Sequence, residues 1–233
     1  FDSVKTTGTL SAGTVFTSSV NDVEFQFVPI TDFTASNTGS QISFLNIPIY
    51  EGTFVTTRIT VDADDVSQRF VIPDNRADTN TLIVEVENSS ADSTATTYIK
   101  TTDISQVTST SANYFIQEVE NGKHEIYFGD GVIGKGLSDG NVVVMTYVVT
   151  NGTSANTAAA FTNAAVIDTV IDVSVSTVSA ASGGAVAESI DSIKYNAPLD
   201  FASQGRCVTA DDYTTFVKRF FPNTQAVSIF GGE

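Results

Sequence analysis

Residues whose types and spacing could support catalysis or ligand binding occur at a few places in the 233-residue sequence. The most suggestive is Gly129-x-Gly131-x-x-Gly134, which has the glycine spacing of a dinucleotide-binding loop. Such a loop opens directly into a helix, whose N-terminus holds the pyrophosphate. Here the β-branched run Val142–Val144 follows instead. We therefore interpret the glycines as residues of a tight turn with positive φ angles, not as a nucleotide site.

A second candidate is the acidic run Asp62-x-Asp64-Asp65, whose carboxylates could bind calcium. The run lacks the glycine and the distal glutamate of an EF-hand loop. A solvated turn between two strands is the favoured interpretation. The calcium hypothesis would make the protein an extracellular calcium-dependent adhesin or a carbohydrate-binding β-sandwich, and it remains as an alternative.

His124 and Cys207 are the single histidine and the single cysteine of the chain. One residue of each type excludes a His-rich metal centre, a cysteine-based zinc site and a disulfide framework. Nothing in the sequence supplies His124 with a nucleophile and an orienting acid. We therefore expect no catalytic activity, no cofactor and no metal.

The charge balance narrows the range of partners. The chain carries 11 basic and 27 acidic residues, with a formal net charge of −16. Such a surface repels a phosphate backbone, so nucleic acid is not an expected partner. No apolar run approaches the ~20 residues of a membrane-spanning helix, and no membrane insertion is expected. The first residue is Phe1 rather than methionine, from which we expect the sequence to be part of a longer protein.

The aliphatic residues predict a mostly β protein of the α+β class. There are 28 valines, 17 isoleucines and 32 threonines against 5 leucines, and β-branched side chains favour a pleated strand over a helix. Strands are expected at residues 14–16, 23–28, 42–45, 55–61, 69–72, 82–86, 96–100, 114–120, 123–128, 142–149, 171–176 and 226–230. The Asn121-Gly122 pair predicts a hairpin with a type I′ turn.

Helical periodicity appears near the C-terminus. One helix is expected over residues 186–197, ended by Pro198. A second is expected to begin at the N-cap Thr209, with Asp212 as its capping-box partner, and to stop at Pro222. Its aromatic face is expected to pack on a sheet of the same chain.

The elements predict several small β-rich modules followed by a short two-helix section. We expect an N-terminal β module at residues 1–50 and a central β domain at residues 51–152 with the Asn-Gly hairpin and the glycine-rich loop. Residues 153–233 are expected to hold a connection, a strand, the two helices and a closing strand.

Two ordered blocks of sequence resemble the baseplate J-like family. The first runs from Tyr127-Phe-Gly-Asp-Gly to the strand that contains Tyr147. The second runs from Glu188-Ser189 to Gly205-Arg-Cys-Val-Thr-Ala-Asp-Asp-Tyr213. The family-matching residues are Phe128, Gly129, Asp130, Gly131, Gly134, Tyr147, Arg206, Thr209, Asp212 and Tyr213. Within that family, residues 51–73 are most similar to the baseplate wedge proteins of T4-like contractile-tailed phages.

This resemblance implies a structural role without catalysis, cofactor or metal. It implies contacts with further copies of the same protein, as homodimer contacts within a ring, and with other wedge and hub proteins of the baseplate. It also implies a place in the virion, after assembly in the host cytoplasm, and participation in the rearrangement that triggers sheath contraction.

Overall fold

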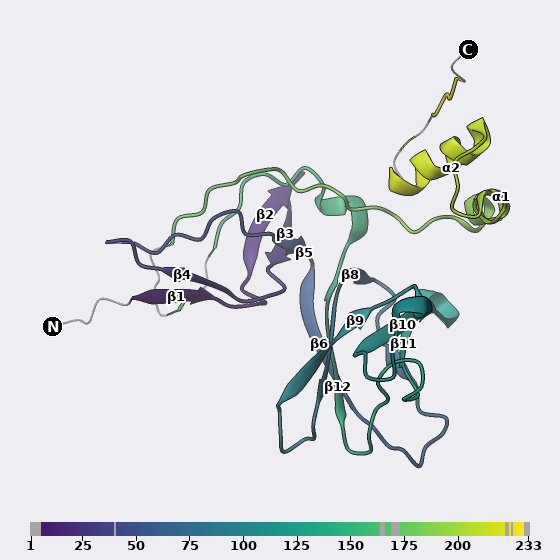
Figure 1. Cartoon of the computed structure of the whole chain (residues 1–233). Helices are drawn as coiled ribbons and strands as arrows, with labels where there is room; N and C mark the ends of the chain where they lie inside the picture. Colours follow the sequence, from purple (N-terminus) through teal and green to yellow (C-terminus); the bar gives the residue numbers. More distant parts are fainter. Residues whose placement is uncertain are drawn as a thin grey trace. The chain divides into compact units, whose positions relative to one another are not determined.

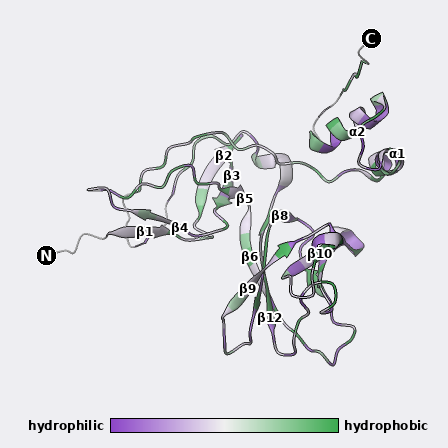
Figure 2. Ribbon diagram, viewed as in Figure 1, coloured by the Kyte–Doolittle hydropathy of each residue, from purple (hydrophilic) through white to green (hydrophobic). Residues whose placement is uncertain are grey.

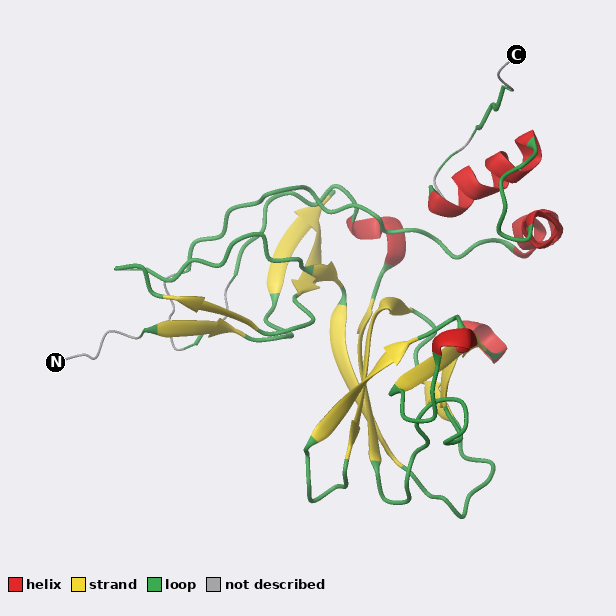
Figure 3. Ribbon diagram, viewed as in Figure 1, coloured by secondary structure: helices red, strands yellow, loops and turns green. Residues whose placement is uncertain are grey.

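The structure is a computed structural model that describes residues 6–39, 41–163, 166–168, 173–221, 224 and 226–230. The chain forms two compact units, Phe1–Ser182 and Gly183–Glu233. The described strands all belong to the first unit and both α-helices to the second (Figure 1). The mostly β fold class with a short two-helix section is confirmed, as Figure 3 shows. The division into domains 1–50, 51–152 and 153–233 remains a prediction.

Two small sheets occupy the N-terminal part of the first unit. Strands β1 (Thr7–Leu10) and β4 (Phe33–Ser36) form an antiparallel pair. Strands β2 (Phe16–Val20), β3 (Val23–Val28) and β5 (Tyr50–Glu51) form an antiparallel sheet with β3 in the middle. Asn21 and Asp22 both have positive φ angles and close the β2–β3 hairpin, which is the geometry of a type I′ turn.

The core under these small sheets includes residues from much later in the chain. Phe27 on β3 packs edge-on against Phe161, with ring centroids 4.9 Å apart. Thr17 on β2 exchanges two backbone hydrogen bonds of 2.9 Å with Thr162. Segment 153–162 therefore packs with the N-terminal strands, on the side occupied by the buried Ala158.

A seven-stranded sheet is formed by strands between residues 53 and 149 of the first unit. Its strands are β6 (Thr53–Thr60), β7 (Phe70–Ile72), β8 (Ala77–Glu87), β9 (Ala95–Lys100), β10 (Asn113–Glu118), β11 (His124–Phe128) and β12 (Val142–Val149). The order across the sheet is β6-β12-β8-β9-β10-β11-β7. All neighbouring pairs are antiparallel except β9 and β10, which run parallel after a connection containing the 3₁₀-helix η1 (Ile104–Gln106).

The seven strands enclose one hydrophobic core. Ile59 on β6 and Ile72 on β7, at the two ends of the strand order, both join this cluster. Met145 at the centre of β12 and Ile126 on β11 are buried in it as well. A flat sheet would hold its outer strands far apart, so the sheet curls around the shared core.

Several sequence predictions need correction in the first unit. Residues 42–45 form only a single bridge, between Asn37 and Ile42, instead of a strand. Residues 173–176 form no strand either, and residues 171 and 172 lie outside the described residues. The predicted hairpin at Asn121-Gly122 is confirmed, with φ angles of 63° and 69°. Its loop also includes Glu120, because Glu118 pairs directly with His124.

The second unit contains helices α1 (Ile190–Ser203) and α2 (Ala210–Phe220). The predicted end of the first helix at Pro198 is wrong, since Pro198 lies inside α1. Proline removes one backbone bond from a helix interior, but the later turns still close with their own bonds. The helix ends instead at Gln204, a left-handed C-cap whose N–H donates to Phe201.

The second unit has no strand among its described residues, so the packing of the aromatic face of α2 on a sheet stays a prediction. Figure 2 shows apolar and polar turns along α2, and its Phe220 side chain is 69% exposed. Residues 226–230, predicted as a closing strand, form no strand, and Pro222 lies outside the described residues. Among the described residues of the second unit, no apolar side chain is buried. Neither α1 nor α2 is long and apolar enough to cross a bilayer.

Candidate functional site

The first family-matching block forms the loop that leaves β11. The Asp130 carboxylate accepts the N–H groups of Val132 and Ile133 through Oδ1, both at 2.9 Å. These N–H groups, Ile133 first, hold the pKa of Asp130 below its usual range. Asp130 therefore acts as a local turn residue, and the loop has no helix whose N-terminus could receive a pyrophosphate.

The glycines of this loop have separate roles. Gly131 and Gly134 have φ angles of +85° and +83°. Residues other than glycine adopt such angles only at a cost in conformational free energy. Gly129 is needed for space, because a β-carbon there would lie 2.3 Å from the carbonyl oxygen of Ile133. The predicted tight glycine turn is thus confirmed, and part of its glycine requirement is steric.

The loop also binds the segment before β10. Gly134 N–H donates to Thr108 O at 3.1 Å, and Lys135 N–H donates to Ser111 O at 2.8 Å. The Ser111 hydroxyl in turn accepts the Thr108 N–H at 3.0 Å. The loop after β11 and the turn before β10 thus form one hydrogen-bonded rim at this end of the curled sheet.

The two aromatic residues of the first block belong to the core. The Phe128 ring packs edge-on against Phe70 and Tyr98, with centroid separations of 5.5 Å and 5.2 Å. Tyr147 is 1% exposed, and its hydroxyl lies 3.2 Å from the Thr57 hydroxyl. Both residues therefore stabilise the core that the curled sheet encloses.

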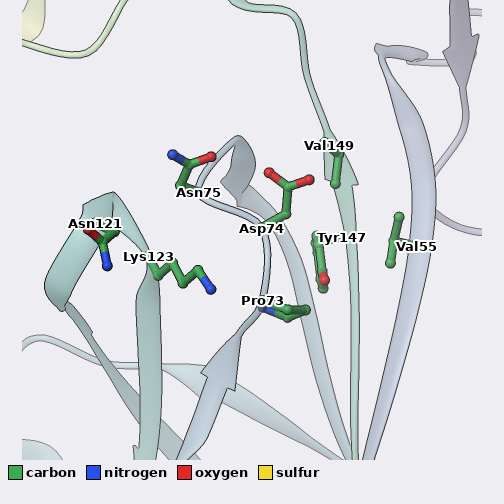
Figure 4. A pocket seen from close by; sticks show the side chains of 8 residues that line it. All are labelled: Val55, Pro73, Asp74, Asn75, Asn121, Lys123, Tyr147 and Val149. Carbon is green, nitrogen blue, oxygen red and sulfur yellow. The ribbon is translucent and has the colours of Figure 1, made fainter.

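An open depression of about 460 Å³ lies at the Tyr147 side of the sheet. Figure 4 shows its lining by Val55, Pro73, Asp74, Asn75, Asn121, Lys123, Tyr147 and Val149. The Asp74 carboxylate already pairs with Arg76 at 3.3 Å. The depression presents one ammonium group and two amides above an apolar floor, without a paired acid and base suited to catalysis.

The second family-matching block connects the two helices of the second unit. Thr209 caps α2, with its hydroxyl accepting the Asp212 N–H at 3.2 Å. Asp212 Oδ2 accepts the Thr209 N–H at 2.8 Å and the Val208 N–H at 3.1 Å, which lowers the pKa of Asp212. The predicted capping box is confirmed. Arg206 bonds back to Gln204 at 2.9 Å, at the end of α1.

Tyr213 enters this arrangement only through its backbone. Its N–H donates to Thr209 O at 3.1 Å, while 46% of its surface is exposed. Within each block the structure thus brings the residues together for turns, caps and packing. The two blocks belong to different compact units.

The remaining residues considered for metal binding or catalysis, the aspartates of the Asp62–Asp65 loop and His124, lie in a turn and in a strand. The Asp62 and Asp65 carboxylates accept backbone N–H groups of their own loop, from Asp64 and Ser67. His124 lies on β11, and its buried Nδ1 has no hydrogen-bond partner among the described residues. In the part of the chain that the structure describes, no group of three His, Cys, Asp or Glu residues could hold a metal ion. Nothing here favours the calcium-dependent alternative.

Two ion pairs on the outer face of the sheet were missed by sequence reasoning. Arg58 on β6 binds Glu87 on β8 through both guanidinium nitrogens, across the intervening strand β12. Arg69 binds Glu125 with bonds of 2.6 Å and 2.7 Å. Partners 29 and 56 residues apart have no local sequence signal.

Acid should weaken the pair at Glu125. Folding lowers the pKa of the Glu125 carboxyl group from 4.5 to about 2. The main cause is that Arg69 donates hydrogen bonds to the carboxylate, and a bond from Gln117 adds to the effect. A pKa that is lower in the folded than in the unfolded state stabilises the folded protein at pH values above the unfolded-state pKa. This contribution is lost as pH falls from about 4.5 through about 2. Arg69 is 56% exposed, so solvent limits the contribution to about 1–2 kcal/mol.

Glu125→Gln measures that contribution. We expect the variant to melt below the wild type at pH 7, and the difference to shrink as pH falls toward 2. The exposed Glu118→Gln, on the neighbouring strand, is the matched control and should stay within about 0.5 kcal/mol of wild type at both pH values. Equal melting of Glu125→Gln and wild type at pH 7 would contradict the prediction.

Comparison with known proteins relates the chain to the structural proteins of phage tail baseplates. One similar protein is the "Baseplate wedge protein gp6" of Enterobacteria phage T4, with 29% identity over an alignment of 253 positions. The alignment covers 95% of this chain and 36% of that protein, so the chain spans about a third of the relative's length. No family model matches the chain, and membership of the baseplate J-like family stays a prediction.

Proposed function

We propose that the protein is a wedge subunit of a contractile phage tail baseplate. In this role it assembles by protein–protein contacts and takes part in the rearrangement that triggers sheath contraction. The observation that carries the proposal is the similarity to the T4 baseplate wedge protein, which extends over 95% of the chain. Similarity across both compact units favours a shared architecture over a borrowed motif.

The geometry of the motif residues supports a structural role. Asp130 and Asp212 use their carboxylates to accept backbone N–H groups, at the glycine loop and at the start of α2. Phe128 and Tyr147 belong to the core of the seven-stranded sheet. In these roles the residues fix the shape of the glycine loop and of the start of α2. A defined surface shape is the property that an assembly subunit needs.

The proposal includes the partners and the location. The protein would contact further copies of itself as a homodimer within a ring, together with other wedge and hub proteins. It would function in the virion after assembly in the host cytoplasm, as a non-enzymatic component. The exposed aromatic residues of the helical unit, such as Phe201 at 82% and Phe220 at 69%, are suited to burial in such an assembly.

Antibody labelling of the source phage tests this function. Antibodies raised against the chain should label the tail tip in negative-stain electron micrographs. Antibodies pre-absorbed with the purified chain are the control and should leave the tails unlabelled. Label on cell surfaces, or no label on tails whose baseplates have been disrupted to expose buried sites, would overturn the proposal.

A further inference from the structure

The edge strand β6 presents an open row of backbone hydrogen-bonding groups. It is the first strand in the order of the seven-stranded sheet and pairs there only with β12 (Figure 1). The pairing extends over its full length, from Thr53 opposite Val149 to Thr60 opposite Val142. An edge of eight regular residues is a template for another strand.

The register defines which groups point outward. Val61, directly after β6, donates its N–H to Asn141 O at 2.8 Å. Bonding residues alternate along an antiparallel ladder, so the odd-numbered residues of β6 bond to β12 and the even-numbered residues face away. The outward backbone groups therefore belong to Phe54, Thr56, Arg58 and Thr60.

Most of these outward groups have no partner within the described residues. The carbonyl of Thr60 accepts the Gln68 side-chain amide at 2.7 Å. No backbone bond on this side involves Phe54, Thr56 or Arg58. A three-position ladder with free N–H and C=O groups remains, and the group that fits it is the backbone of another extended chain.

The usual protections of an edge are missing from β6. The strand contains no proline and no lysine, and its ladder with β12 has no bulge. Its one charged residue, Arg58, forms an ion pair with Glu87 across β12, so its charge does not oppose the pairing of another strand at the edge. By contrast β7, at the opposite end of the strand order, has only three residues.

The end of this edge is strongly acidic. Asp62, Asp64, Asp65 and Asp139 are all exposed, and none forms an ion pair within the described residues. The loop holds them together, since Asp139 Oδ1 accepts the Ala63 N–H at 3.1 Å. A strand added to β6 would bring one of its ends beside these four carboxylates.

We propose that the β6 edge binds an extended segment of a different protein as an added antiparallel strand, with basic residues at the end beside the Asp62–Asp65 loop. A second β6 strand is disfavoured as the occupant of this edge, because its Thr53–Val55 end, which antiparallel pairing would bring beside the acidic loop, carries no basic residue. Such a site would serve baseplate assembly, yet its chemistry is independent of that function. Failure in the peptide experiment below would leave the tail-labelling experiment unaffected.

A synthetic strand tests the site on the full chain. The probe is a blocked nine-residue peptide of alternating threonine and valine with two lysines at its N-terminal end. At saturation, amide hydrogen exchange should slow at least ~10-fold at Thr56 and Arg58, whose N–H groups face outward. Exchange at Thr57 and Ile59, already bonded to β12, should not change. The same peptide with glutamates in place of the lysines should bind about 10-fold more weakly.

Two substitutions assign the binding to the edge and to the charge. Thr56→Pro removes an outward N–H that β12 does not use, and it should abolish binding up to about 1 mM peptide. Asp64→Asn removes a carboxylate that accepts no bond from the described residues, and it should weaken binding of the lysine peptide about 3-fold. Asp22→Asn, in the β2–β3 turn, is the matched control and should bind like wild type.

Three results would overturn the proposal. One is unchanged exchange at Thr56 and Arg58 with the peptide present. Another is equal binding of the lysine and glutamate peptides. The third is a dimer of the free chain in sedimentation equilibrium that Thr56→Pro dissociates, because a second copy would then occupy the edge. Asp64→Asn lies in an exposed loop, so the charge test remains decisive if Thr56→Pro fails to fold.

Discussion

Replacing Gly52 by alanine is expected to lower the melting temperature of the first unit by about 8–16 °C, which corresponds to about 4 kcal/mol. Gly52 connects β5 to β6 with a φ of +129° and donates its N–H to Gln26 O at 2.9 Å. A β-carbon at this position would lie 2.2 Å from the Val149 carbonyl oxygen and 2.7 Å from Val148 Cγ1. Backbone strain and steric overlap each cost about 1–3 kcal/mol.

Gly39→Ala separates these two costs. Gly39 has a similar φ of +121°, but a β-carbon there meets nothing within 4 Å. The control should therefore lose only the strain contribution, about 1–2 kcal/mol. Thermal unfolding followed by circular dichroism measures both variants. Equal losses at Gly52 and Gly39 would show that the close approach of β12 has no energetic consequence.

Replacing Gly129 by alanine is expected to cost the first unit about 3 kcal/mol, or about 6–12 °C in melting temperature. The added carbon would lie 2.3 Å from the Gly134 carbonyl carbon and 2.3 Å from the Ile133 carbonyl oxygen. Both atoms are backbone, so the loop must move as a whole. That movement would stretch the bonds from Gly134 to Thr108 and from Lys135 to Ser111.

Gly131→Ala is the matched variant in the same loop. Gly131 has a φ of +85° and open space around it, so its replacement should cost about 1 kcal/mol. Amide exchange of Val132 and Ile133, whose N–H groups bind Asp130, should accelerate in Gly129→Ala more than in Gly131→Ala. A larger loss from Gly131→Ala would show that backbone strain outweighs the close approach at Gly129.

Local elements of the candidate site were predictable from the sequence. The Asn121-Gly122 turn and the Thr209–Asp212 capping box both have the expected geometry. In each case the interacting residues lie within a few positions, so their types alone fix the hydrogen bonds. The glycine loop was predictable as a turn for the same reason. Its contact with Thr108 and Ser111 was not, because these partners lie more than 20 residues earlier in the sequence.

Helix boundaries were less predictable where the sequence carried conflicting signals. Ser189 supplies an N-cap by accepting the Ser192 N–H at 3.2 Å, which starts α1 after Val186. Glu188 adds bonds to Ser192 and Asn196 in the first turns. The proline at position 198 indicates a helix end in the sequence, but the tertiary structure continues the helix past it.

The sequence by itself determined the β-rich class, the turns and the caps, because side-chain type sets backbone preference within a few residues. Only the tertiary structure decided the order of the seven strands, the parallel pairing of β9 with β10 and the ion pairs of Arg58 and Arg69. It also decided which groups of β6 face away from the sheet. These features depend on residues far apart in the chain, and their free energy comes from the shared burial of the core around Met145 and Tyr147.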